Sequence, residues 1–188
     1  MARVKFFKIF GLAFLCGLVL MLTSIFISRP RAEAFTKARL FAPGLSVTEQ
    51  ISTTDIAAIK KDGYKTIVDF RPGGEAPDQV PSATMERVAR ANGMSFSYIP
   101  VPHGPIPDSA VAALDSTLSK SPRPVLLYCR SGKRAARTLS LYEASRADGP
   151  DAAGILAMVQ GVGQSADDLS SEINQRIAHR NQATGAAK

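Results

Sequence analysis

The segment VLLYCRSGKR, residues 125–134, contains Cys129, the only cysteine beyond residue 28 of the chain. VLLY predicts a buried strand, and the residues after the cysteine predict a short loop that leads into a helix. In such a loop, successive backbone N–H groups and the N-terminus of the helix point to one place and attract an anion. A thiol that faces them favours its reactive thiolate form. We therefore interpret Cys129 as a nucleophile rather than as a small core side chain.

The residues after the cysteine form a predicted anion-binding loop, which consists of Arg130, Ser131, Gly132, Lys133 and Arg134. Gly132 allows backbone torsions that a side chain would forbid. Arg134 offers a planar guanidinium that binds two oxygens of a tetrahedral anion. Lys133 is expected to be surface charge. The loop is therefore expected to hold an oxyanion next to the thiol.

Strands and helices alternate along the rest of the chain. Strands are expected at residues 44–50, 65–70, 94–101 and 125–128, and helices at residues 52–63, 82–92, 109–120, 151–160 and 166–180 as well as after the cysteine loop. This order predicts an α/β fold with a mostly parallel sheet that is flanked by helices. Because loops after parallel strands leave from one edge of the sheet, residues 71–81 and 102–107 are expected to converge on Cys129.

An uncharged apolar run, IFGLAFLCGLVLMLTSIFIS, covers residues 9–28. A helix of this length, rising about 1.5 Å per residue, crosses a hydrocarbon core of about 30 Å. Ala32, Glu33 and Ala34 resemble a cleavage site, but the run exceeds the about 7–15 apolar residues of a signal peptide, so we expect a retained anchor. The predicted segments are a basic N-terminal segment (1–8), a transmembrane anchor (9–28), a juxtamembrane linker (29–40), a folded domain (41–180) and a disordered tail (181–188).

The formal charge of +7 is concentrated near the predicted anchor, because residues 1–39 contain seven Lys and Arg side chains and one acid. The rest of the chain is nearly neutral and lacks the electrostatic footprint of a nucleic-acid-binding protein. Contact of the basic residues with membrane lipids is expected instead. Cys129 has no second cysteine in its domain, which excludes a disulfide there. His103, His179 and one thiol lack the spacing of a zinc site, and we expect neither a metal nor a cofactor.

The segments LSVTEQIS, YKTIVDFRPGGE, YIPV and YCRSGKRAA resemble the bacterial family called beta-lactamase hydrolase-like protein, phosphatase-like domain, which is related to dual-specificity phosphatases. The resemblance implies a cysteine-phosphatase-like fold and a phosphocysteine mechanism with Cys129 as the nucleophile. With the anchor, it indicates a single-pass protein of the bacterial inner membrane. Basic residues on the two sides of the anchor nearly balance, and the default for an uncleaved signal places the domain in the periplasm.

The resemblance also implies a general acid on the loop after YIPV, where dual-specificity phosphatases carry an aspartate. His103 stands at that place in this sequence, and Asp108 is the second candidate, although PDSA also predicts a helix N-terminus there. Asp69 and Arg71, at the end of the second predicted strand, are expected to support the cysteine loop through an ion pair.

The length of the cysteine loop leaves two reactions open. Tyrosine phosphatases place the arginine six positions after the cysteine, whereas here Arg134 is five positions on and Ala135 is the sixth. This spacing resembles the shorter loop of rhodanese sulfurtransferases, which hold a persulfide on the cysteine. We expect a membrane-anchored phosphatase-like hydrolase that acts on a phosphoester. The alternatives are a sulfurtransferase that uses a sulfur donor and a non-catalytic phosphate-binding module.

Overall fold

The structure is a computed structural model that describes residues 34–186. The described residues belong to the unit Ala34–Lys188, and the predicted anchor at 9–28 lies outside the described residues. Within the described part of the chain, no helix is long and apolar enough to cross a membrane. The elements of this unit are β1 (Arg39–Ala42), β2 (Leu45–Thr48), α2 (Ile56–Lys61), β3 (Thr66–Asp69), α3 (Ser82–Ala91), β4 (Ser95–Tyr98), α4 (Asp108–Lys120), β5 (Val125–Tyr128), α5 (Lys133–Ser145), α6 (Ala152–Gly161), η1 (Asp167–Leu169) and α7 (Ser170–Ala186).

The strands form one sheet in the order β1-β2-β5-β3-β4. β1 runs antiparallel to β2, and all other neighbours are parallel, which confirms the predicted α/β fold with a mostly parallel sheet. The register places Thr48 of β2 and Asp69 of β3 level with Tyr128 of β5. The loops after these three strands therefore leave from the same edge of the sheet, where Cys129 follows β5.

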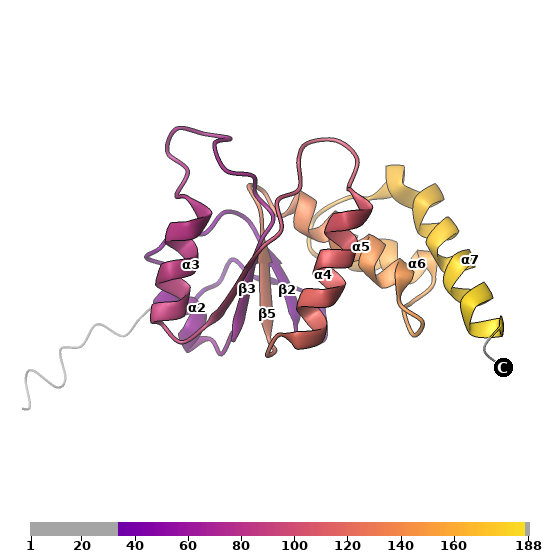
Figure 1. The fold of residues 1–188 in the computed structure, drawn as a ribbon, viewed down its shortest axis with the longest axis horizontal. Coiled ribbons are helices and arrows are strands. Elements are labelled where there is room, and N and C mark those ends of the chain that lie inside the picture. Colours follow the sequence, from indigo (N-terminus) through magenta and orange to yellow (C-terminus); the bar gives the residue numbers. More distant parts are fainter. Residues whose placement is uncertain (1–33, 187–188) are drawn as a thin grey trace, which may run out of the picture. The chain divides into compact units, whose positions relative to one another are not determined.

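Helices cover both faces of the sheet (Figure 1): α2 and α3 lie on one side, α4, α5 and α6 on the other, and α7 packs against α5. Alternate strand residues point to opposite faces, and β5 contributes to both. Leu126 and Tyr128 belong to the apolar cluster beside α2 and α3, whereas Val125, Leu127 and Cys129 belong to the cluster beside α4 and α5. The thiol therefore lies on the α5 side of the sheet.

The helix α5 is enclosed on nearly every side. Residues 134–144 are all buried, and the helix contacts α4, α6, α7, β2 and β5. The hydroxyls of Thr138 and Ser140 donate to the carbonyls of Arg134 and Arg137, both at 2.8 Å, so these buried polar groups are paired within the helix. This packing fixes the first turn of α5, which follows the cysteine loop directly.

The strand β1 begins at Arg39, inside the segment predicted as a linker at 29–40. Gly44, with φ of +74°, lies in the turn that leads from β1 into β2. Phe41 is the buried residue of β1, whereas Leu40 is 70% exposed. A strand with one buried side chain has too little alternation of apolar and polar residues to be recognised from sequence.

The helix α7 continues to Ala186, so the prediction of a disordered tail from residue 181 is wrong. The Arg180 guanidinium donates to the carbonyls of Glu143 at 2.9 Å and Pro150 at 2.6 Å, which ties α7 to the end of α5. Residues 181–186 lack an apolar face, but they extend a helix that is already anchored and needs no new nucleus.

Candidate active site

Cys129 follows β5 directly and is only 1% exposed. The chain turns into α5 at Gly132, whose φ of +83° lies in the left-handed region that favours glycine. A Cβ atom at this position would lie 3.3 Å from Cγ1 of Val47 and 3.4 Å from the carbonyl oxygen of Thr48. The loop therefore packs closely on the end of β2, and the conformational role predicted for Gly132 is confirmed.

The carbonyl groups of the cysteine loop are bonded to neighbouring elements. The Arg130 carbonyl accepts the Gln50 backbone N–H at 3.2 Å, and the Ser131 carbonyl accepts Nε2 of Gln164 at 3.0 Å. Within residues 34–186, no acceptor is bonded to the backbone N–H groups of residues 131–134. Such groups at the start of a helix have no partner within it. They form the open set of donors that the sequence predicts.

The guanidinium of Arg134 is buried and held by Glu75. Its Nη1 and Nη2 donate to Oε1 and Oε2 of Glu75 at 2.6 and 2.8 Å, and Nη1 also donates to the Val101 carbonyl at 2.9 Å. A guanidinium has five N–H donors, so Nε–H and one N–H of Nη2 remain for other acceptors. Burial lowers the pKa of Arg134, but the bonds to Glu75 and the interaction with Cys129 outweigh it, so the pKa is raised. A permanent cation therefore lies beside the thiol.

Glu75 connects the loops around the thiol. Besides Arg134, its carboxylate binds Nε of Arg71 at 3.1 Å and lies 3.4 Å from Nε2 of His103. Its backbone N–H donates to Oε1 of Gln79 at 3.1 Å, which stabilises the loop after β3. The hydrogen bonds from Arg134, acting against burial, lower the pKa of Glu75 from 4.5 to about 2. Glu75 is therefore ionised and joins the loops after β3, β4 and β5.

Asp69 and Arg71 belong to this network, but the predicted ion pair between them is wrong. The backbone N–H of Arg71 donates to Oδ1 of Asp69 at 2.8 Å, because the turn after β3 brings the amide rather than the side chain to the carboxylate. The Arg71 guanidinium instead binds Glu75 and donates to Oε1 of Gln50 at 2.9 Å. Burial raises the pKa of Asp69, although hydrogen bonds from Arg71 and Tyr128 act in the opposite direction.

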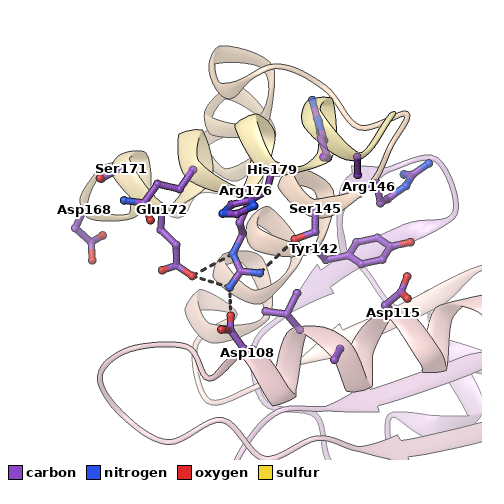
Figure 2. Close-up of a pocket in the computed structure, with 15 residues that line it drawn as sticks. Asp108, Asp115, Tyr142, Ser145, Arg146, Asp168, Ser171, Glu172, Arg176 and His179 are labelled. Atoms are coloured by element: carbon purple, nitrogen blue, oxygen red, sulfur yellow. Dashed lines mark hydrogen bonds and ion pairs between the residues drawn. The ribbon is translucent and has the colours of Figure 1, made fainter. Parts of the chain in front are cut away.

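Of the two predicted acids, His103 reaches the network around Cys129, and its side chain is 78% exposed. Asp108 lies at the start of α4, and its carboxylate is paired with Arg176 of α7, which also binds Glu172 (Figure 2). The groove in Figure 2 runs between α4, α5 and α7 and includes neither His103 nor Arg134. The ion pair explains why Asp108 is directed to α7 rather than to the cysteine loop.

A second groove, of about 610 Å³, opens beside Arg134. The loop at 103–106 forms one wall, and Lys133 and Leu169 contribute to the other. Arg137, one helical turn after Arg134, also lines it, but two bonds of 2.5 and 2.7 Å to Asp168 compensate its charge. The groove offers a substrate access to Arg134, with the exposed His103 at its rim.

The other side chains of the predicted loop face solvent. Arg130, Ser131 and Lys133 are exposed, which agrees with the expectation that Lys133 is surface charge. No group of three or more His, Cys, Asp or Glu side chains in the described part of the chain is arranged to hold a metal ion. The site thus brings together a thiol, backbone amides, the buried arginines Arg71 and Arg134, and the carboxylates of Asp69 and Glu75.

Glu75 is the site residue that sequence reasoning missed. It belongs to the segment DFRPGGE, where an acid in a loop of glycine and proline is typical of solvent-exposed charge. Its partner Arg134 is 59 positions away. The available signal was indirect: a buried arginine at the start of the helix after β5 requires an acceptor, and the loop after the neighbouring strand β3 offers Glu75.

Glu75→Gln is expected to destabilise the domain at neutral pH and to reduce its sensitivity to acid. The pKa of Glu75 is lowered from 4.5 to about 2, so its stabilising contribution is present above pH 4.5 and is lost as the pH falls towards about 2. The stability difference between wild type and variant should shrink over this interval. Urea unfolding of the full chain in detergent, repeated at several pH values, measures it.

Glu86→Gln is the matched control, because Glu86 forms an ion pair of 2.8 Å with Arg90 on the exposed surface of α3. Exposed pairs contribute little to stability. The difference in stability between wild type and Glu86→Gln should therefore hardly change with pH. If the stability difference from wild type shrank equally at low pH in Glu75→Gln and Glu86→Gln, a special role for the Glu75 carboxylate would be contradicted.

Residues 37–146, more than half of the chain, match the family described as beta-lactamase hydrolase-like protein, phosphatase-like domain. The beta-lactamase hydrolase-like protein of Xylella fastidiosa (strain Temecula1) is 28% identical over 99 residues, which are 53% of this chain and 23% of that protein. The chain thus spans less than a quarter of the length of this curated relative.

Two solved structures share the fold. A candidate phosphatase of Neisseria meningitidis superposes with a TM-score of 0.65 at 24% identity, and the match covers 73% of this chain and 96% of that one. Kinase associated phosphatase, with a serine in place of its catalytic cysteine, gives a TM-score of 0.60 at 14% identity and covers 79% and 98%. Since the family match also contains Cys129, Glu75 and Arg134, the chain belongs to the beta-lactamase hydrolase-like protein, phosphatase-like domain family.

Proposed function

We propose that the domain is a cysteine-dependent phosphatase that hydrolyses a phosphoester. The thiolate of Cys129 attacks the phosphorus, the bond from phosphorus to the leaving oxygen breaks, and a phosphocysteine forms. Water then attacks the phosphocysteine, which releases inorganic phosphate and restores the thiolate. Both steps balance without an oxidant or a reductant.

The observation that carries this proposal is the combination of open amides and a fixed guanidinium at one buried thiol. The N–H groups of residues 131–134 are free to bind phosphoryl oxygens, and Arg134 retains two N–H donors after binding Glu75 and Val101. Donors that are already oriented stabilise the charge of a transition state without reorganisation. Glu75 supplies that orientation, because it holds both ends of the Arg134 fork.

The test of the function is hydrolysis of p-nitrophenyl phosphate by the full chain in detergent. We expect turnover that vanadate inhibits, since vanadate imitates the phosphoryl group within the loop. A parallel assay with thiosulfate and cyanide measures sulfur transfer. Suppose that thiocyanate formation depends on Cys129 and that the wild type hydrolyses p-nitrophenyl phosphate no faster than Cys129→Ser. The domain would then be a sulfurtransferase rather than a phosphatase.

Sulfur transfer is the second candidate, and the short loop favours it. Four residues separate Cys129 from Arg134, and the helix α5 already begins at Lys133. A terminal persulfide sulfur is a single atom and fits a shorter loop than a phosphoryl group with three oxygens. In this reaction Cys129 takes the outer sulfur of thiosulfate and releases sulfite, and cyanide then removes that sulfur as thiocyanate.

His103→Ala is expected to lower the rate of phosphoester hydrolysis by about 10²–10⁴, because His103 is the proposed acid that protonates the leaving oxygen. Its Nε2 lies 3.4 Å from Oε1 of Glu75, which orients the ring at the rim of the groove. The pH–rate profile of the wild type should be bell-shaped, and the alkaline limb should disappear in the variant. Steady-state kinetics at several pH values measure both effects.

The control for this variant is Asp108→Asn, which removes the other candidate acid and its pair with Arg176. We expect it to retain the alkaline limb. Loss of that limb in Asp108→Asn but not in His103→Ala would assign the acid to Asp108. A sulfur-transfer reaction needs no such acid, so His103→Ala should leave it nearly unchanged.

We further propose that residues 9–28 anchor the domain to the bacterial inner membrane, with the domain on the periplasmic side. The support is the length and the uncharged character of this segment. The full chain should remain with membranes after a carbonate wash. A mature chain that begins at Phe35 would instead assign the segment to a cleaved signal.

A further inference from the structure

A small pocket of about 300 Å³ lies on the β2 side of the cysteine loop. Its walls are β1, the end of β2, the loop residues Ser131 and Gly132, and the turn at 162–164 that follows α6. It shares no lining residue with the groove beside Arg134. The two cavities therefore use different parts of the same loop.

Arg39 of β1 supplies an uncompensated positive charge to this pocket. Among residues 34–186, no hydrogen bond or ion pair engages its guanidinium, which is exposed. The guanidinium lies against Gly163, where a Cβ atom would be only 3.0 Å from Nη1. Gly163, with φ of +72°, thus permits both the turn and the close approach of the arginine. This position leaves Arg39 available to an anion from outside.

The remaining charges of the pocket do not cancel Arg39. Glu49 also lines the pocket, and its Oε1 lies 3.4 Å from Nζ of Lys37. Both side chains of this pair are more than half exposed. Because Lys37 compensates Glu49, the charge of Arg39 is in excess. Nε2 of Gln164 donates to the Ser131 carbonyl at 3.0 Å, which ties the wall of the pocket to the cysteine loop.

An exposed apolar side chain accompanies the cation on the edge of the sheet. Leu40 is 70% exposed, and β1 is the terminal strand of the sheet. Successive residues of a strand point to opposite sides, so Arg39 and Leu40 flank the free edge of β1. A basic and an apolar side chain at one edge suit the boundary between lipid headgroups and acyl chains.

We propose that the β1 edge docks on an anionic lipid surface, with a headgroup phosphate in the Arg39 pocket and Leu40 at the acyl boundary. The proximity of a bilayer rests on the proposed anchor, because the segment between residues 28 and 37 extends over about 30 Å at most. The proposed contacts with the lipid are made by Arg39 and Leu40 of β1. Docking at this edge would leave the groove beside Arg134 free for substrate.

A fluorescent probe on β1 tests the docking. The full chain with Cys16→Ser, Cys129→Ser and Leu40→Cys carries one thiol for bimane and is inserted into vesicles that contain nitroxide-labelled lipid. We expect stronger quenching in vesicles of phosphatidylcholine with phosphatidylglycerol than in phosphatidylcholine alone. Adding Arg39→Ala should reduce the ratio of docked to undocked chains by about fivefold, as expected for one basic residue at an anionic surface.

Arg87→Ala is the matched control, since Arg87 is an exposed arginine on α3, which contacts β4 at the end of the sheet opposite β1. It should leave quenching unchanged, and circular dichroism melts check that every variant folds. Equal quenching in both lipids, or equal losses in the Arg39 and Arg87 variants, would overturn the proposal. So would an Arg39-dependent thermal shift with inorganic phosphate that anionic vesicles do not reproduce, because the pocket would then bind a soluble anion.

Flotation of the wild-type chain separates this inference from the proposed anchor and function. A chain that fails to float with phosphatidylcholine vesicles would refute the anchor, and additional flotation with phosphatidylglycerol that Arg39→Ala removes would still support docking. None of these measurements depends on phosphatase activity.

Discussion

Cys129→Ser is expected to reduce phosphoester hydrolysis by about 10⁴-fold or more, as removal of a covalent nucleophile does in other enzymes. Cys129 is the thiol beside Arg134 and the open amides of residues 131–134. Serine has almost the same shape but is a far weaker nucleophile at neutral pH. Turnover of p-nitrophenyl phosphate by wild type and variant, at equal concentrations of folded protein, measures the loss.

Chemical labelling gives an independent measure of the same role. Iodoacetamide should inactivate the wild type, and vanadate or phosphate should protect it, because the anion would occupy the loop next to the thiol. Cys16→Ser is the control that excludes labelling of the other cysteine of the chain. If Cys129→Ser kept the wild-type rate, or if anions gave no protection, Cys129 would be a buried core side chain without a catalytic role.

Arg134→Ala is expected to lower kcat/KM by about 10²–10³, which is the usual cost of removing a donor that is aimed at the charge of a transition state. The variant also leaves the partly buried Glu75 carboxylate without its two shortest bonds, so it should be less stable. Arg134→Lys should not restore activity, because an ammonium cannot hold both carboxylate oxygens and a substrate oxygen with a planar fork. Steady-state kinetics and thermal melts measure the two effects.

Two further variants separate catalysis from stability. The double variant Arg134→Ala with Glu75→Gln also removes the carboxylate that has lost Arg134 and keeps only Arg71 and His103 as partners, so it should regain part of the stability but not the activity. Arg146→Ala removes a comparable pair at the other end of α5, where Arg146 binds the buried Glu143 at 2.9 Å. This control should lose stability with little change of kcat/KM. Recovery of activity in the double variant would mean that Arg134 serves only to compensate Glu75.

The sequence predicts the local arrangement of residues around Cys129 better than it predicts which distant residues contact them. Cys129, Gly132 and Arg134 all lie within residues 129–134, so one strand-to-helix turn is enough to define their arrangement. The convergence of the neighbouring loops also follows from the parallel order of the strands. Glu75 differs, because its role depends on which atom of a distant loop reaches Arg134, and spacing along the chain carries no such information.

Local patterns also explain the errors in the fold. The strand β1 has one buried side chain, and its pairing with β2 supplies the stability that its own sequence does not indicate. The end of α7 has the composition of a tail, but contacts of Arg180 with α5 hold the helix in place. Asp108 has the pattern of an acid near the site, yet Arg176 from α7 pairs with it. In each case a contact between distant segments outweighs the local sequence.

Because α5 is buried, it should unfold only together with the elements that enclose it. Residues 134–144 are enclosed by helices and strands, and the carbonyls of the cysteine loop are bonded to Gln50 and Gln164. The cysteine loop, with Arg134 in the first turn of α5, therefore belongs to the most cooperative part of the domain and should lose its structure only when the whole domain unfolds. His103 lies on an exposed loop outside this unit. The nucleophile and the proposed acid are thus governed by different fluctuations, one global and one local.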